Sequence, residues 1–585
     1  MKQNSSMAQR RLFVFSSPGL RVGLLLGVWL CLANVATVRA AKEEEAEASR
    51  VKIKIEPQVR IPMRDGVTLA AEIYRPDAPG KFPALMLLRY YQTGTSNAKF
   101  FARRGYAVAL VDSRGRGRSE GQWVPYVNEA QDGYDAQQWL GKRPWCNGKI
   151  GMFGQSYNGF TQVVSATLGS PYLKCLVPVE CQQSNFGHLY NDGVLQLNVV
   201  FTFGLYATGK TQTGPHIPIG PHYQQLPLMS AADKVDNPQA QRIKTWMKHA
   251  RYDDYWKSYS VKEKYPRIQA PAYFITGWYD NLVHECWRNF QGFRQQGGTE
   301  AVRQGTKILI GPWTHGGSGN QRELHLRWYD YWLKGIDTGL QAEPPIKIYV
   351  MGAEKWRYAS QWPLPQTKFT NFYLHSQGDA NSVQGDGSLN TTPPETGAPA
   401  DQFTYDPANP VPTLGGQMST HKEIWGPKDR SSVQQRRDIL VYSTQPLTED
   451  VEVTGPVKMK LYAASSAVDT DFTATLTDVH PDGRAIHICE GIRGTAFRES
   501  LEHPTPITPG KIYEYTIDLW ETSMVFKRGH RIRLEISSSN FPRYARNQNT
   551  GLPLGTSAKM NRAQQTIFHH AKFASHLILP IIPAN

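Results

Sequence analysis

The stretch "GKIGMFGQSYNGFTQVVSATLG", residues 148–169, predicts a short strand, a tight turn and a helix in succession. A serine on such a turn stands above the end of a sheet, next to the backbone N–H groups that open the helix. This is the setting of a nucleophile elbow, for which the usual pattern is G-x-S-x-G. Gly154 and Ser156 fit that pattern, but Asn158 stands where the second glycine is expected, and Gly159 comes one place later.

A second serine fits the pattern letter for letter. Ser119 lies in "GRSEG", residues 117–121, between two correctly spaced glycines. It follows "DSRGRGR" and precedes "EGQWVPYV", which is loop composition on both sides. We therefore expect Ser156 to be the nucleophile rather than Ser119, with a helix N-cap as the ordinary alternative for Ser156.

The residues around the elbow, from about 50 to 185, alternate between strand and helix patterns. Two of the predicted strands, residues 82–91 and 106–114, are continuous apolar runs, which are typical of parallel strands covered on both faces. The predicted strands include "VTLAAEIYRP" (67–76), "FPALMLLRYY" (82–91), "YAVALVDSR" (106–114) and "LKCLVPVE" (173–180), and "EAQDGYDAQQWLGKR" (129–143) predicts a helix. This alternation predicts an α/β fold with a doubly wound, mostly parallel sheet.

Two changes of composition divide the chain further. Residues 186–264 are helix-rich, polar and aromatic, which predicts an insertion, and strand patterns resume in "PAYFITGWYD" (271–280) and "TKILIGPWTHGG" (306–317). From about 356, Gly, Pro, Asn and Asp are frequent and short β-type runs follow, which predicts an all-β sandwich of jelly-roll type. The expected domains are an α/β domain (41–185 and 265–355), a helical cap (186–264) and a jelly roll (356–585).

A serine nucleophile also needs a base and an acid that orients the base. Asp280 closes the strand pattern of "PAYFITGWYD", and His315, among sixteen histidines, directly follows a strong late strand in a Gly-rich turn. The order Ser156, Asp280, His315 is the order of an α/β-hydrolase triad. Taken singly, Asp280 could be a turn residue and His315 a structural histidine; together they predict the triad.

The first forty residues predict an export signal. They contain five basic groups and no acidic group, a 15-residue apolar run at 22–36, and "VRA" before Ala41. The run is shorter than the ~20 residues of a membrane-spanning helix, so we expect cleavage and no stable membrane span afterwards. The predicted location is periplasmic or extracellular.

Charge and cysteine content argue against two kinds of site, a nucleic-acid interface and a cysteine zinc site. The net charge of +15 falls to +10 without the first forty residues, and the remaining excess is not clustered, which argues against nucleic-acid binding. Five of the six cysteines remain after cleavage, and either one disulfide, with Cys175 and Cys181 as the nearest pair, or buried free thiols are expected. No cysteine spacing suggests zinc, and neither metal nor cofactor is expected.

Several longer stretches resemble one family. The stretch "GQSYNG" fits that family's elbow G-x-S-Y-x-G, in which the late glycine is normal. Further matches are "GWYD", "GPWTH", "LRWYDYWLKG", "DSRGRGRSEG", "YDPANPVPTLGG", "LTEDVEVTGPV", "DTDFTATLTDVHPDGRA" and "SSSNFPRYARNQNTG". The sequence thus resembles the X-Pro dipeptidyl-peptidase/cocaine esterase (CocE/NonD) family of serine hydrolases. The matching motifs occur in the family's order and span nearly the whole chain after the signal.

The resemblance implies an α/β-hydrolase domain with a cap and a jelly roll, and it implies Ser156, Asp280 and His315 as the triad. It also implies an oxyanion hole made by the Tyr157 backbone N–H and a tyrosine hydroxyl from an R-x-P-Y motif. Here the chain has "LLRYYQTG", with no proline. Tyr91 is the expected hydroxyl donor and Tyr90 the alternative. One tyrosine and not both should face the elbow, because neighbouring side chains on an extended segment point in opposite directions.

The predicted activity is hydrolysis of a small-molecule ester or amide through an acyl-enzyme. X-Pro dipeptidyl-peptidase or α-amino acid ester hydrolase activity is the alternative, and it would need carboxylates to hold a free ammonium. The candidates are Asp192, Asp253, Asp254 and Glu285. A non-catalytic binding protein is the rival class, and a homo-oligomer is compatible with the sequence.

The cap aromatics are expected to shape the substrate pocket, with packing of the cap onto the sheet as the ordinary alternative. They are Phe186, Tyr190, Phe201, Phe203, Tyr206, Trp246, Tyr252, Tyr255 and Trp256.

Overall fold

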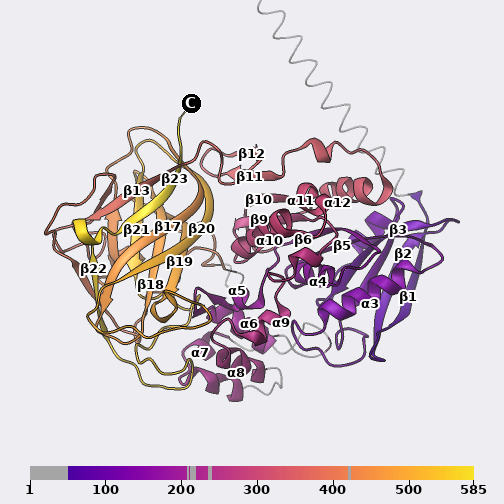
Figure 1. Cartoon of the computed structure of the whole chain (residues 1–585), viewed down its shortest axis with the longest axis horizontal. Helices are drawn as coiled ribbons and strands as arrows, with labels where there is room; N and C mark the ends of the chain where they lie inside the picture. The colour runs from indigo at the N-terminus through magenta and orange to yellow at the C-terminus, as the bar shows by residue number, and fades with distance from the viewer. Residues whose placement is uncertain (1–49, 207–209, 211–218, 235–239, 419–422, 585) are drawn as a thin grey trace, which may run out of the picture.

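The computed structural model describes residues 50–206, 210, 219–234, 240–418 and 423–584. Figure 1 shows an α/β part, coloured indigo to rose, beside an all-β part in orange and yellow, with the helices α5 to α9 between them at the lower edge. The predicted export signal lies outside the described residues. Among those residues, no helix is long and apolar enough to cross a membrane.

Within the described residues, ten strands form the sheet of the α/β part, in the order β1-β2-β4-β3-β5-β6-β9-β10-β11-β12. All pairs from β4 to β11 are parallel. The strands are β1 (Ile53–Pro62), β2 (Thr68–Pro76), β3 (Phe82–Arg89), β4 (Ala107–Asp112), β5 (Cys146–Gln155), β6 (Leu173–Val179), β9 (Tyr273–Tyr279), β10 (Lys307–Thr314), β11 (Ile346–Val350) and β12 (Lys355–Ala359).

Helices cover both faces of this sheet, because successive side chains of each strand point to opposite faces. Along β3, Met86 and Leu88 belong to the hydrophobic core that includes α3 (Glu129–Gly141), α4 (Tyr157–Ala166) and α10 (Val283–Gln296); α3 and α4 contact β3, and α10 contacts β9. Leu85 and Leu87 pack on the other face with α2 (Ser96–Ala102) and α12 (Arg322–Tyr329). The shorter α11 (Glu300–Gly305) precedes β10. The doubly wound, mostly parallel sheet predicted from the sequence is thereby confirmed.

The expected helical insertion follows β6 and precedes β9, so it is confirmed as well. Its elements are α5 (Asn185–Leu189), β7 (Tyr190–Asn191), β8 (Val194–Leu195), α6 (Leu197–Tyr206), α7 (Ile219–Tyr223), η1 (Leu228–Lys234), α8 (Gln241–Lys248) and α9 (Asp254–Tyr259). Phe186 stacks on Tyr190 at a centroid distance of 5.0 Å and also contacts Trp256, so part of the aromatic set packs the cap internally. The side chain of Tyr206 lies outside the described residues.

The C-terminal domain is all-β, as the sequence predicts. Within the described residues, eleven strands form its sheet. They are β13 (Lys368–His375), β14 (Ser388–Asn390), β15 (Asp401–Tyr405), β16 (Leu440–Ser443), β17 (Val451–Ser465), β18 (Asp471–Val479), β19 (Ala485–Gly494), β20 (Tyr513–Phe526), β21 (Arg531–Ser537), β22 (Ala563–Phe568) and β23 (His576–Ile582). The boundary expected at residue 356 falls within β12, which pairs with β11 as an edge strand of the other sheet.

The two sheets are joined by polar contacts close to the end of β9. The Tyr279 hydroxyl donates to the backbone oxygen of His487 on β19 at 3.1 Å, and Gln417 donates to the backbone oxygen of Trp278 at 3.3 Å. The C-terminal domain therefore braces the strand that leads to Asp280.

The described cysteines are buried free thiols at positions 146, 175, 181, 286 and 489. Of the two alternatives, the structure has free thiols, and Cys175 and Cys181 are not joined. Cys175 is fully buried within β6, whereas Cys181 lies beyond the end of that strand.

Candidate active site

Ser156 lies on the sharp turn between β5 and α4. Its backbone adopts φ 60° and ψ −124°, a strained conformation for a non-glycine residue, and its N–H donates to the Val179 oxygen at 2.8 Å. Gly154 approaches the helix closely, since a Cβ there would lie 2.7 Å from the Asn158 oxygen. This strand, turn and helix form the elbow expected from the sequence.

The late glycine and the asparagine of "GQSYNG" have separate structural reasons. A Cβ at position 159 would lie 2.7 Å from the Val179 oxygen and 2.9 Å from Cys181 Cβ, so α4 crosses the end of β6 where Gly159 leaves room. Asn158 is buried, and its Oδ1 accepts a hydrogen bond from the backbone N–H of Tyr90 at 2.8 Å. The residue that replaces the usual glycine thus fixes the segment that carries Tyr91.

The structure brings Ser156, His315 and Asp280 together although they are far apart in the chain. His315 Nε2 lies 3.1 Å from Ser156 Oγ, and His315 Nδ1 lies 2.9 Å from Asp280 Oδ1. Asp280 is fully buried and accepts further hydrogen bonds from the Leu282 backbone N–H at 3.0 Å and the Thr276 hydroxyl at 2.8 Å. Such a chain can hold the imidazole in place and pass the serine proton to it.

Glu180 is a fourth residue at this site, and the sequence analysis did not single it out. It follows β6 directly, is fully buried, and its Oε2 lies 3.4 Å from His315 Nδ1. The same oxygen accepts from Gln155 Nε2 at 2.6 Å and from the Gly316 backbone N–H at 2.8 Å. The signal available in the sequence was a glutamate at the end of an apolar strand that neighbours the nucleophile strand.

The two buried carboxylates change the acidity of His315. Burial alone lowers the pKa of His315, but the charges of Asp280 and Glu180 outweigh it and raise the pKa to about 9. Burial, together with the nearby Asp280 charge, raises the pKa of Glu180 to about 7, although His315 opposes that rise. The site therefore favours a protonated imidazole more strongly than one carboxylate would.

Tyr91 and Tyr90 occupy different surroundings. Burial raises the pKa of the Tyr91 hydroxyl, and hydrogen bonds with the Ser156 side chain and the Tyr157 backbone N–H act in the opposite direction. The Tyr90 ring lies instead between Trp123, at a centroid distance of 4.5 Å, and Tyr157, at 4.8 Å. Of the two tyrosines, Tyr91 presents its hydroxyl to the elbow.

A cavity of about 410 Å³ opens beside the serine, a size suited to a small molecule. Ser156, His315, Tyr91 and Gln155 line it together with Leu87, Thr93, Gly94, Asn97, Leu110, Phe153, Gly154, Asn158 and Gly316. Within the described part of the chain, the lining contains no carboxylate.

Ser119 is buried away from this cavity. Its hydroxyl donates to the Asp112 backbone oxygen at 2.6 Å and accepts from the Ala70 backbone N–H at 2.8 Å. Both contacts tie a loop to the sheet, which is a structural use of the serine.

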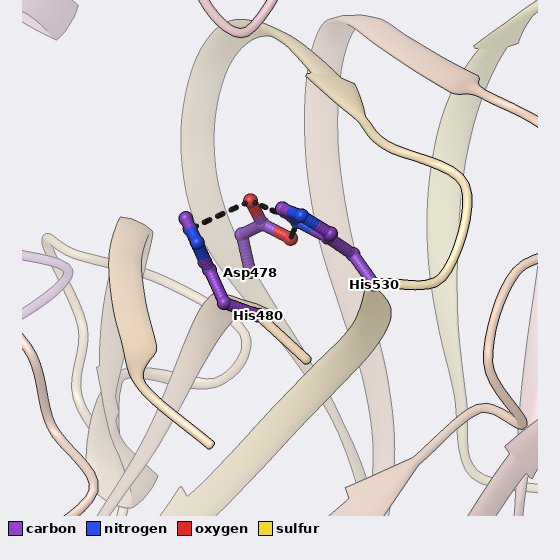
Figure 2. A group of neighbouring side chains, drawn as sticks. All are labelled: Asp478, His480 and His530. Carbon is purple, nitrogen blue, oxygen red and sulfur yellow. Dashed lines mark hydrogen bonds and ion pairs between the residues drawn. The ribbon is translucent and has the colours of Figure 1, made fainter. Parts of the chain in front are cut away.

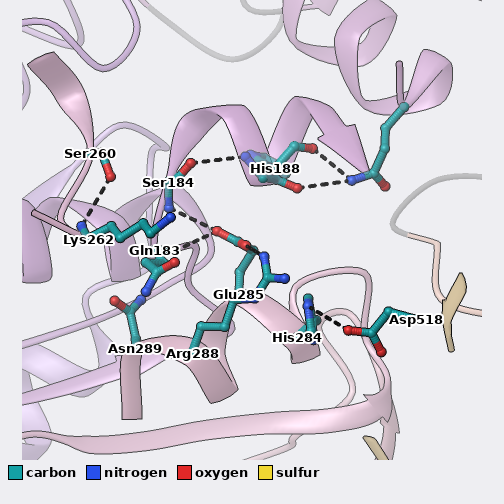
Figure 3. A network of polar contacts seen from close by, with 12 residues as sticks. Gln183, Ser184, His188, Ser260, Lys262, His284, Glu285, Arg288, Asn289 and Asp518 are labelled. Carbon is teal, nitrogen blue, oxygen red and sulfur yellow. Dashed lines mark hydrogen bonds and ion pairs between the residues drawn. The ribbon is translucent and has the colours of Figure 1, made fainter. Parts of the chain in front are cut away.

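The four carboxylates considered for ammonium binding are placed elsewhere or already engaged. Figure 3 shows Glu285 accepting from the backbone N–H groups of Gln183 and Ser184, at 3.1 and 2.9 Å, and pairing with Arg288 at 3.1 Å. Asp192 lies 3.8 Å from the Arg493 guanidinium.

The other two carboxylates lie further along the cap, at and next to the start of α9. Asp253 lies 2.7 Å from His249, and Asp254 is exposed on α9.

Of the cap aromatics, Phe203 lies nearest the elbow among the contacts described, 6.1 Å from the Tyr157 ring and 5.5 Å from the His188 ring.

Comparisons with known proteins agree with this architecture. Residues 65–317 match the X-Pro dipeptidyl-peptidase (S15 family) model, and residues 338–578 match the X-Pro dipeptidyl-peptidase C-terminal non-catalytic domain. The chain is 37% identical over 572 residues to the cocaine esterase of Rhodococcus sp. (strain MB1 Bresler), covering 90% of this chain and 98% of that protein.

Solved structures share the fold over nearly the whole chain. An aminopeptidase from a marine sediment archaeon, Thaumarchaeota archaeon, superposes with a TM-score of 0.78 at 23% identity, covering 91% of this chain and 97% of its own. An α-amino acid ester hydrolase superposes with a TM-score of 0.78 at 24% identity, covering 90% and 96%. The chain belongs to the X-Pro dipeptidyl-peptidase/cocaine esterase (CocE/NonD) family of serine hydrolases.

Proposed function

We propose that this chain is an acyl esterase or acylase that cleaves small esters or amides with Ser156 as nucleophile, His315 as base and Asp280 as the orienting acid. The observation that carries the proposal is the hydrogen-bond chain from Ser156 through His315 to Asp280, which opens onto a cavity of about 410 Å³. The proposal also draws on the kinship with an esterase over almost the full chain.

The reaction proceeds in two halves. Ser156 Oγ attacks the acyl carbon while His315 Nε2 takes the hydroxyl proton, and the carbonyl oxygen becomes an oxyanion facing the Tyr91 hydroxyl and the Tyr157 N–H. The intermediate collapses, the bond to the leaving group breaks, and His315 returns the proton to that group. Water then repeats these steps on the acyl-enzyme and releases the acid.

The proposal favours plain acyl groups over substrates with a free ammonium. Binding an ammonium in a partly dry cavity requires a carboxylate partner, and the described residues that line this cavity offer none. Glu285 already receives two backbone N–H groups and Arg288, so it has little capacity left for a substrate.

A matched substrate series tests this preference. We compare kcat/KM for three substrates. They are the p-nitrophenyl ester of an acyl chain, the p-nitrophenyl ester of the same chain carrying an α-amino group, and an X-Pro anilide. We expect the ester without the amine to be turned over fastest. A preference for the aminoacyl ester or the X-Pro anilide would overturn the substrate assignment while leaving the triad intact.

We propose that Glu180 tunes the acidity of His315. The Glu180→Gln substitution removes one of the two charges that raise the pKa of His315 to about 9, so that pKa should fall. Since the neutral imidazole is the base, the acid limb of the kcat/KM profile should move to lower pH. The profile is measured on an unactivated ester from acidic to alkaline pH.

The exposed Glu300→Gln on α11 serves as the matched control, because it removes the same charge far from the site. A purely structural role for Glu180 would lower the melting temperature and leave the acid limb where it is.

We also propose that the enzyme is exported and works in the periplasm or outside the cell. The support is the basic segment, the apolar run at 22–36 and the "VRA" before Ala41. Mass spectrometry of the protein from an exporting bacterial host should find Ala41 as the first residue. An intact Met1 terminus in the soluble cytoplasmic fraction would contradict export.

A further inference from the structure

Asp478, His480 and His530 converge at one end of the C-terminal sheet, apart from the triad. Figure 2 shows the Asp478 carboxylate between the two imidazoles. His530 Nδ1 lies 2.9 and 3.0 Å from the two Asp478 oxygens, and His480 Nε2 lies 3.5 Å from Oδ2. One nitrogen of each histidine and one carboxylate oxygen all lie within 4.8 Å of one another.

The strand register explains why these side chains meet. Asp478 and His480 are two residues apart at the end of β18, so both project from the same face of the sheet. Strand β18 pairs antiparallel with β21, with Val479 opposite Arg531, so the next position of the ladder sets His480 against His530. Two ligands at i and i+2 and a third across the ladder therefore share one face.

Both histidines are held by turns before anything binds. The His480 N–H donates to the Arg484 oxygen, and the His530 N–H donates to the Lys527 oxygen, each at 2.9 Å. The Leu447 N–H donates to the His530 oxygen at 2.8 Å. Fixed backbones on both sides reduce the ordering that ligand binding would require.

We propose that Asp478, His480 and His530 bind a divalent cation of the zinc class, with a fourth position open to water. Tetrahedral zinc with bonds of about 2.0–2.2 Å places its ligand atoms roughly 3.3–3.6 Å apart, and the nitrogen–oxygen distances of 2.9–3.5 Å in the structure are close to that spacing. Imidazole nitrogens with one carboxylate favour zinc, nickel or copper over magnesium and calcium.

Arg484 is the neighbour that must adjust. Its Nη2 lies 3.4 Å from His480 Nδ1, which would carry the proton once Nε2 binds the metal. The same side chain is 54% exposed and bonds Asp482 through Nε at 2.7 Å. It can keep Asp482 and rotate away from the imidazole at little cost.

The bound ion would join the β18–β19 hairpin to the turn that precedes β21. Strand β19 carries the backbone oxygen of His487, which receives the Tyr279 hydroxyl at the boundary with the α/β domain. A metal at this place would stabilise the C-terminal domain and its contact with that boundary, and the hydrolysis itself would not require it.

Zinc titration of the metal-stripped full chain, in competition with a chromophoric chelator, tests the site. The wild type should bind one Zn²⁺, and its melting temperature should rise with added zinc. His480→Ala and His530→Ala should each weaken binding by at least about 100-fold. His480→Gln, which keeps the size of the side chain, should lose binding in the same way.

Two controls separate this site from others. His503→Ala removes an exposed histidine of the same domain and should bind zinc as the wild type does. His315→Ala disrupts a second cluster within the described residues, which consists of one histidine and two carboxylates, Glu180–Asp280–His315, and this variant should also keep the zinc.

Unchanged ester hydrolysis by His480→Ala in the absence of zinc would show that this variant is folded. No binding at micromolar zinc, equal binding by His480→Ala and wild type, or loss only in His315→Ala would each overturn the proposal.

Discussion

Replacing Ser156 with alanine is expected to lower kcat by on the order of 10⁶, because the variant has no atom that can form the acyl-enzyme. The fold should persist, since the contacts of the Ser156 hydroxyl among the described residues are with His315 and Tyr91, both at the site itself. Covalent labelling by a fluorophosphonate should disappear with the activity. Both are measured on the same purified protein.

Ser119→Ala is the matched control for that variant. It removes the same atom from a buried serine whose hydroxyl, in the described part of the chain, bonds the Asp112 and Ala70 backbones, so it should lower the melting temperature and leave labelling intact. Labelling that survives in Ser156→Ala and disappears in a folded Ser119→Ala would move the nucleophile to the other serine.

Tyr91→Phe is expected to lower kcat by about 10²–10³, or roughly 3–4 kcal/mol of transition-state stabilisation, with little change in KM. The Tyr91 hydroxyl forms hydrogen bonds with the Ser156 side chain and the Tyr157 backbone N–H, where the proposed mechanism places the oxyanion of the tetrahedral intermediate. A donor used only in the transition state affects kcat rather than substrate binding. Steady-state kinetics on one activated ester gives both constants.

Tyr90→Phe removes the same atom from the neighbouring residue and should cost much less, because that ring packs between Trp123 and Tyr157. The reverse result would move the role to Tyr90. Nearly full kcat in both variants would place the second oxyanion donor elsewhere.

The parts of the site that follow from local sequence were the easiest to predict. Ser156, Asp280 and His315 each come directly after an apolar strand, and parallel strands bring their carboxyl ends to one edge of the sheet. The alternation of strand and helix patterns predicted the fold class, and this rule predicted the three positions. It could not decide between Tyr90 and Tyr91, because the choice depends on the Asn158 contact that fixes their segment.

The position of Glu180 after β6 follows the same rule, but its role does not, and the histidine pair could not be found in this way. The role of Glu180 depends on Gln155 and Gly316, which lie elsewhere in the chain. Both donate hydrogen bonds to the Glu180 carboxylate and hold it beside His315. His480 and His530 are fifty residues apart and meet only because β18 and β21 share a register. Contacts across a sheet depend on strand order, which composition and spacing leave undetermined.

The assignment of Ser156 as the nucleophile is tested most directly by trapping the acyl-enzyme during turnover of an activated ester, by rapid acid quench, and locating the acyl group by peptide mass mapping. If Ser156 is the nucleophile, the mass of one acyl group is found on the peptide that contains Ser156 and nowhere else. An acyl group on the peptide that contains Ser119, or rapid turnover with no covalent adduct on any serine, would contradict it.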